Sequence, residues 1–301
     1  MSRPSSALSF LKPEHVAPIR SLTLRARGIV EGLIAGLHKS PYHGFSSEFL
    51  EYRPYRYGEP ARSIDWRKYA RNDRSVVRLF EDETNLSARI LFDKSNSMRF
   101  NSGYPMSKFE YGRTLAASLA WILIRQRDAV GVTIFDDTVE TAIPPRSTNI
   151  QLKTILSCLE RTTPGNRTNC GRAIDSIARR VRKRGLCIII SDLFDTPEAI
   201  VNSVRHLTFK HQDVMVLWIL DPGELRFTKK DLLDITDLET RERILIDGET
   251  ASFFHTAGFA GHRKIVEQAF RELGIDHAII ATDEPFQKAL IRILEKRRRL
   301  F

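Results

Sequence analysis

The stretch ARILFDKSNSM, residues 88–98, joins a short apolar run to a loop rich in oxygen donors. Residues 88–92 have the length and composition of a buried β-strand. The loop that follows carries side-chain oxygens at Asp93, Ser95 and Ser97, which are alternate positions. A buried strand that ends in such a loop is typical of an α/β protein whose ligand site lies at the edge of its sheet.

Strand-like and helix-like segments alternate from this stretch to the C-terminus. The expected strands are residues 88–92, 129–135, 138–143, 186–190, 214–220 and 277–281. The expected helices are residues 107–126, 149–160, 171–184, 197–210, 261–273 and 284–298. Such alternation with short connections predicts the α/β class: a doubly wound, mainly parallel sheet covered by helices on both faces.

A second apolar strand, residues 186–190, also runs into oxygen donors, at Ser191-Asp192. Between the two strands, Arg167-Thr168-Asn169 precedes an expected helix. Ligands of open α/β sheets bind beyond the carboxyl ends of the strands, where the winding direction reverses. If the two strands are neighbours, five side chains converge on one point: Asp93, Ser95, Ser97, Thr168 and Asp192.

The chemistry of these five side chains suits a hard cation. They offer two carboxylates and three hydroxyls with no histidine or thiolate, which favours Mg²⁺, or alternatively Mn²⁺ or Ca²⁺, over zinc or copper. Neutral hydroxyls leave the cation short of anionic ligands, so a carboxylate from outside would be attracted to it. The alternative interpretation is a set of helix caps and turn residues, where Ser and Asp are common. Asp136-Asp137 could be secondary metal ligands, but a hairpin turn explains them better, and Asp195 could either lie near the mouth of the site or cap the helix that begins at Pro197.

The pattern Asp93-x-Ser95-x-Ser97, with a later Thr and a later Asp, resembles the metal-ion-dependent adhesion site of von Willebrand factor A domains. The wider match, from about residue 38 to the C-terminus, is to the bacterial domain-of-unknown-function fifty-eight family. Its motifs stand here as Glu48-Phe49, Arg53-x-Tyr55, Gly58-Glu59-x-x-Arg62-x-Ile64-Asp65-Trp66, Ala70-Arg71, Val77-x-x-Phe80-Glu81, Asp93-Lys94-Ser95-Asn96-Ser97-Met98 and Ser191-Asp192-Leu193-Phe194-Asp195.

The resemblance implies a von Willebrand factor A-like core with one antiparallel edge strand, here residues 138–143. It also implies partnership with a MoxR-type AAA+ ATPase. Many relatives carry N-terminal transmembrane helices, and this chain differs because no stretch approaches the roughly 20 apolar residues that span a bilayer. Without a signal peptide either, a cytoplasmic location is expected.

Two regions are expected along the chain. Residues 1–86 would form a helix at 21–37 and a small β-rich region with strands near 49–55 and 75–81, and residues 87–301 would form the von Willebrand factor A-like domain. Arginines and aromatics between Arg53 and Trp66, together with a net charge of +10, allow nucleic-acid binding as an alternative to simple packing.

Enzymatic activity is not expected, and no catalytic residue is assigned. A phosphatase of the haloacid dehalogenase type needs a second Asp two residues after the first, where this chain has Ser95. Neither a GxxxxGK[ST] phosphate loop nor a GxSxG elbow occurs in the sequence. The favoured function is therefore metal-dependent protein binding, with a metal-dependent hydrolase as the first alternative and a nucleic-acid binder as the second.

Overall fold

The computed structural model describes residues 11–38, 51–54, 69, 76–79, 86–165, 169–225, 232–236 and 243–298. Its centre is a six-stranded sheet in the order β10-β7-β6-β3-β4-β5. All neighbours pair in parallel except β4 and β5, which pair antiparallel at the edge. The strand bounds are β3 Ser87–Asp93, β4 Ala129–Phe135, β5 Val139–Arg146, β6 Gly185–Ser191, β7 Gln212–Leu220 and β10 Asp276–Ala281. The expected fold class is confirmed, including the antiparallel edge strand.

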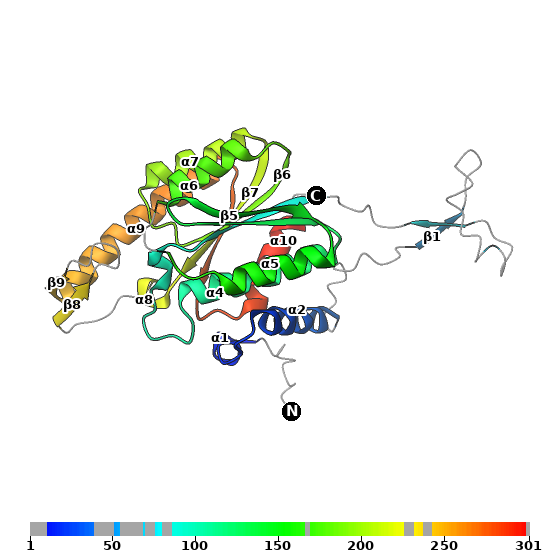
Figure 1. Cartoon of the computed structure of the whole chain (residues 1–301). Helices are drawn as coiled ribbons and strands as arrows, with labels where there is room; N and C mark the ends of the chain where they lie inside the picture. Colours follow the sequence, from blue (N-terminus) through cyan, green and yellow to red (C-terminus); the bar gives the residue numbers. More distant parts are fainter. Residues whose placement is uncertain are drawn as a thin grey trace, which may run out of the picture.

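Burial along the strands follows their place in the sheet. The central strand β6 is buried at every position, as its run of apolar residues predicts. The edge strand β5 alternates between half-buried and exposed residues. In β3, Ile90 and Phe92 belong to the core on one face of the sheet, and Leu91 belongs to the core on the other face. The sheet therefore separates two apolar layers (Figure 1).

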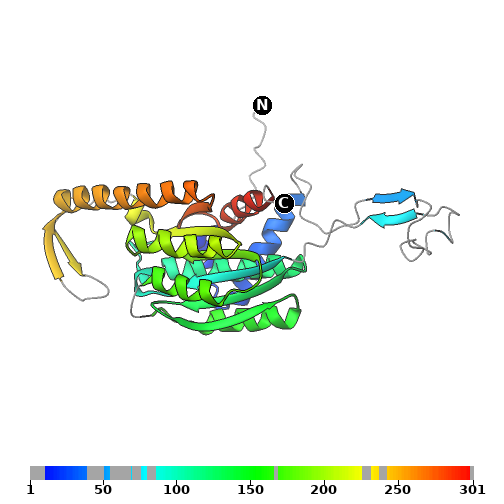
Figure 2. The same cartoon turned by 90° about the horizontal axis from the view of Figure 1, so that it is seen from above.

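Helices cover both faces (Figures 1 and 2). One layer packs α4 Lys108–Arg125, α5 Asn149–Arg161 and α10 Phe286–Arg298 against the sheet. The other packs α6 Cys170–Arg180, α7 Pro197–Phe209 and the C-terminal part of α9 Gly248–Glu272. Two short helical turns, η2 Asn96–Arg99 and α8 Pro222–Leu225, follow β3 and β7. Both turns lie at the end of the sheet where the candidate donors were expected.

The N-terminal helices pack against the main core. After the short α1 Pro13–Val16, helix α2 Leu22–His38 contributes Ala26, Ile29 and Val30 to the same apolar layer as α4 and α10. An ion pair of 2.8 Å between the nearly buried Arg25 and the half-buried Glu110 connects α2 to α4.

The two expected N-terminal strands are confirmed as an antiparallel pair, β1 Glu51–Pro54 with β2 Val76–Leu79. The motifs between these strands, including Trp66, lie outside the described residues apart from Tyr69. The expected boundary between residues 86 and 87 stays a prediction.

The segment between β7 and β10 differs from the expectation. An antiparallel pair, β8 Leu232–Thr236 with β9 Arg243–Asp247, precedes α9, and pair and helix together project from the sheet (Figures 1 and 2). The expected helix of residues 261–273 is thus too short at its N-terminus, because α9 begins at Gly248. Three glycines at 248, 258 and 261 weaken the helical pattern there.

None of the helices that the structure describes combines the length and apolar character needed to cross a membrane.

Candidate metal site at the carboxyl ends of two strands

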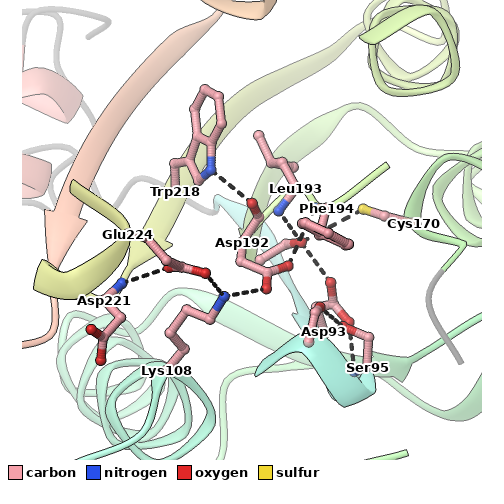
Figure 3. A network of polar contacts seen from close by, with 12 residues as sticks. Asp93, Ser95, Lys108, Cys170, Asp192, Leu193, Phe194, Trp218, Asp221 and Glu224 are labelled. Atoms are coloured by element: carbon pink, nitrogen blue, oxygen red, sulfur yellow. Dashed lines mark hydrogen bonds and ion pairs between the residues drawn. The ribbon is translucent and has the colours of Figure 1, made fainter. Parts of the chain in front are cut away.

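Parallel pairing of β3 with β6 brings the two donor loops to one edge of the sheet. The register places Phe92 beside Ile190, so the residues that follow leave the sheet side by side. These are Asp93 in one loop and Ser191-Asp192 in the other (Figure 3). Strand β4 lies on the far side of β3, so the winding direction reverses between β3 and β6.

Asp93 is the innermost donor and is completely buried. Its Oδ1 accepts a hydrogen bond of 2.8 Å from the backbone N–H of Ser95. Its Oδ2 accepts one of 2.5 Å from the hydroxyl of Ser191. The Asp93 carboxylate is thus held by both loops and joins them.

Ser95 and Ser97 present a pair of neighbouring hydroxyls. A hydrogen bond of 3.0 Å joins their Oγ atoms, and both residues are buried. In an octahedron with Mg–O bonds of about 2.1 Å, adjacent ligand oxygens are separated by about 3 Å. The hydroxyl pair therefore has the spacing of one edge of such an octahedron.

Asp192 carries the second carboxylate and is fixed by three contacts. Its Oδ2 lies 2.7 Å from the Nζ atom of Lys108, and its Oδ1 accepts from the backbone N–H of Phe194 at 3.3 Å. Its backbone carbonyl accepts from the indole Nε1–H of Trp218 at 2.8 Å (Figure 3). Both carboxylates therefore already accept hydrogen bonds, which favours contact with a cation through water.

Lys108 is a buried ammonium with only 1% of its side chain exposed. It pairs with Glu224 at 2.5 Å as well as with Asp192. Burial alone would lower the pKa of Lys108, but the two carboxylates outweigh it and raise that pKa, so the group stays charged. Burial also raises the pKa of Glu224, against the pull of Lys108.

The charges in this cluster do not balance. Within the part of the chain that the structure describes, Lys108 is the one cation that pairs with Asp192 and Glu224, whereas Asp93 accepts hydrogen bonds from Ser95 and Ser191. When all four groups are ionised, the cluster carries a net charge of −2. Burial, and then the nearby charge of Asp192, raise the pKa of Asp93 to about 7, against the hydrogen bonds from Ser191 and Ser95. A divalent cation is the species that would restore neutrality.

Four of the five predicted donors are thus brought together: Asp93, Ser95, Ser97 and Asp192. Thr168 lies outside the described residues. Its neighbour Asn169 caps α6 by accepting from the backbone N–H of Arg172. Among the described residues no three His, Cys, Asp or Glu side chains form a ligand cluster, so a cation here would depend on the serines.

Residues near the site but outside the four candidate donors have structural roles in turns, ion pairs and helix ends. Asp136 forms the expected hairpin turn, because its Oδ1 accepts from the backbone N–H of Thr138 at 3.2 Å. Lys94 points away from the hydroxyl pair and bridges Asp136 and Glu140. Asp195 accepts from the backbone N–H of Gly171 at the start of α6, while Thr196 caps α7. Of the two interpretations of Asp195, the cap of α7 is wrong, whereas a place near the mouth of the site agrees with its position beside Asp192 in the lining of one cavity.

Sequence reasoning missed Lys108, Glu224 and Ser191. One available signal was a lysine in the first turn of a helix, where the helix dipole disfavours a cation unless acidic groups compensate it. No local pattern pointed to Glu224, because it reaches Lys108 only through the fold. Ser191 was noticed as part of a motif but not as the hydroxyl that binds Asp93.

The fold and this edge define an α/β domain with a candidate cation site of hydroxyls and carboxylates. Residues 51–261 match the family described as protein of unknown function DUF58, and the chain belongs to this family. Its six-stranded sheet, parallel except for one antiparallel edge strand, has the arrangement that the resemblance implied.

A relative and two solved structures illustrate the similarity. The relative is an uncharacterised protein of Mycobacterium tuberculosis, 26% identical over 95% of this chain and 91% of its own length. BatB from Bacteroides thetaiotaomicron is 18% identical with a TM-score of 0.45, over 71% of this chain and 99% of that chain. The VWA domain of SpRpn10 is 12% identical with a TM-score of 0.40, over 68% of this chain and 94% of that chain.

Replacing the buried ammonium tests the ion-pair cluster. Lys108→Met leaves Asp192 and Glu224 buried without their cation, so the free energy of unfolding in chelator should fall by about 3–5 kcal/mol. Urea unfolding measures it. The control, Lys153→Met on the exposed side of α5, should change stability by no more than about 0.5 kcal/mol. Equal effects of the two substitutions would show that the cluster contributes nothing specific.

The raised pKa of Asp93 gives the metal-free protein a defined pH dependence. The folded state holds this proton up to a pKa of about 7, whereas the ordinary pKa of an aspartate is 3.8. The folded state therefore binds more protons between these values, and the contribution of Asp93 to stability is lost as the pH rises through that window. Asp93→Asn removes this titration. The free energy of unfolding of the variant, relative to wild type, should therefore increase as the pH rises from about 4 to about 7. Unfolding in chelator at several pH values measures the difference, and a constant difference would contradict the assignment.

Proposed function

We propose that this chain is a metal-dependent protein-binding module rather than an enzyme. The hydroxyls of Ser95 and Ser97 would contact Mg²⁺ directly, and Asp93 and Asp192 would hold it through water, with Thr168 predicted to join them. The observation that carries the proposal is the buried pair of carboxylates, Asp93 and Asp192, beside the hydrogen-bonded hydroxyls of Ser95 and Ser97.

The donor set favours binding over catalysis. Among the described residues only two neutral hydroxyls would touch the cation directly, because Asp93 and Asp192 would hold it through water, so a position in its coordination shell would remain for a carboxylate from outside the chain. Ser95 stands where an aspartyl phosphatase needs its acid/base carboxylate. Lys108 is held by two carboxylates and is almost fully buried. Both observations support a site that binds an acidic side chain rather than one that catalyses a reaction.

The partner that the family resemblance implies is a MoxR-type AAA+ ATPase, with this chain acting as an adaptor. An acidic side chain of the partner would take the remaining position on Mg²⁺. Binding would then need the cation, the hydroxyl pair and the partner's carboxylate at once.

Metal binding should stabilise the folded chain. Mg²⁺ at about 100 times its dissociation constant should raise the free energy of unfolding by about 2.7 kcal/mol. Asp93→Ala should abolish this gain, whereas Asp213→Ala, at the amino end of β7, should keep it. Thermal unfolding and calorimetric titration with Mg²⁺ measure both. An Asp93→Ala variant that binds Mg²⁺ as tightly as wild type would refute the site.

Partner binding separates the function classes. The same variants should be assayed with a purified MoxR-type ATPase in Mg²⁺ and in chelator, where the interaction should need both Mg²⁺ and Asp93. Equal binding in chelator would contradict the proposal. Turnover of a phosphate ester that Asp93→Ala abolishes would show a hydrolase, and chelator-independent DNA binding with a steep salt dependence would show a nucleic-acid binder.

A further inference from the structure

A cavity of about 600 Å³ opens directly beside Asp192. It lies between the β6–α7 loop, the end of β7, α8 and α9. Six apolar side chains line it: Leu193, Phe194, Pro197, Trp218, Leu220 and Phe259. Its volume falls in the range of ordinary ligand pockets, about 300–1,000 Å³. Because the cavity shares Asp192 and Lys108 with the candidate metal site, one bound segment could reach both.

The polar groups at the cavity already have partners. The ammonium of Lys108 pairs with Asp192 and Glu224, and the Trp218 indole N–H donates to the Asp192 carbonyl. The imidazole of His262 packs edge-on against Trp218 with 5.9 Å between ring centroids. An occupant is therefore not needed as a hydrogen-bond donor or acceptor, and the walls favour an apolar group.

The charges around the cavity exclude an acidic occupant. Asp192, Asp195 and Glu224 line it, with Lys108 as the ammonium paired to two of them. A carboxylate placed in the cavity would face these groups at short range in a poorly solvated space. The acidic side chain of a partner would thus sit on the cation, and a neighbouring residue would enter the cavity.

The mouth of the cavity exposes apolar surface next to the metal site. Phe194 is 63% exposed, although its backbone N–H donates to the Asp192 carboxylate. Figure 3 shows this residue beside Asp192 and above Asp93. An aromatic side chain left in solvent at this point extends the apolar wall toward the cation.

We infer that this cavity binds a bulky apolar side chain of a partner segment. The acidic side chain of the same segment would complete the coordination shell of the cation. The site would then recognise an acidic residue followed or preceded closely by an aromatic or large aliphatic one. The part of this inference that concerns the acidic side chain rests on the proposed function. The part that concerns the apolar side chain rests on the cavity alone.

Two glycines of α9 supply a matched pair of variants. Gly258 lines the cavity, and an added Cβ there meets nothing within 4 Å. Gly261 on the same helix is equally open, but it does not line the cavity. Gly258→Leu should therefore fill the cavity mouth without disturbing the fold, and Gly261→Leu controls for the substitution itself.

The probes are small molecules that mimic the apolar and the acidic side chain of the partner segment. The first, 4-phenylbutanol, carries only the apolar half; 4-phenylbutyrate carries both halves, and 4-phenylbutylamine replaces the acid by a cation. Binding is followed by the NMR signal of the Trp218 indole N–H, assigned with Trp218→Phe. In wild type and Gly261→Leu, the alcohol should bind with or without Mg²⁺, and Gly258→Leu should bind it at least about tenfold more weakly. The carboxylate should bind about tenfold more tightly than the alcohol in Mg²⁺ and lose this gain in chelator.

The outcomes test apolar binding in the cavity separately from metal-dependent binding of the carboxylate. If Gly258→Leu binds the alcohol as wild type does, or if the amine binds more tightly than the carboxylate in Mg²⁺, the apolar assignment of the cavity is overturned. The proposed function is untouched by that result if acetate still binds in a Mg²⁺-dependent manner. If the alcohol behaves as expected but the carboxylate gains nothing from Mg²⁺, the link between cavity and cation is overturned; the proposed metal function is refuted as well when acetate also shows no Mg²⁺-dependent binding.

Discussion

Parallel pairing between β3 and β6 is the constraint on which the site depends. The pairing aligns Phe92 with Ile190 and therefore delivers Asp93 and Asp192 to the same edge of the sheet. Both strands are apolar and buried, so the polar atoms of the two loops must satisfy one another where the strands end. The hydrogen bond from Ser191 to Asp93 is the direct result, and it fixes one loop against the other.

Because these residues are buried, the balance of their charges decides which ligand can bind at this edge of the sheet. Ionised carboxylates are costly to bury unless a cation or hydrogen bonds compensate them. Lys108 compensates Asp192 and Glu224, while Asp93 has hydrogen bonds and a raised pKa. The surplus negative charge makes the site receptive to a divalent ion, and the adjoining cavity offers an apolar surface within reach of that ion. Recognition of a partner would combine a strong but short-range polar contact with apolar burial.

The sequence alone predicted the fold and four of the residues that meet at this edge, because their signals are local; that these residues bind a metal stays a prediction. Apolar runs such as residues 186–190 mark buried strands, and Asp93, Ser95 and Ser97 lie within five consecutive residues. Glu224 could not be predicted, because it meets Lys108 across a sequence separation of 116 residues. The pair β8–β9 was missed because its short strands mix Asp and Arg with aliphatic residues and so give no clear periodicity. Lys108 lay in a correctly predicted helix, but its role depends on partners supplied by β6 and α8.

Locating a bound ion tests the central claim most directly. Crystals grown with Mn²⁺ should show an anomalous peak within coordination distance of the Ser95 and Ser97 hydroxyls, with water between the ion and the two aspartates. An Asp93→Ala crystal prepared in the same way should lack the peak. A wild-type crystal with saturating Mn²⁺ and no peak between these loops, or a peak bound elsewhere on the chain, would contradict the account.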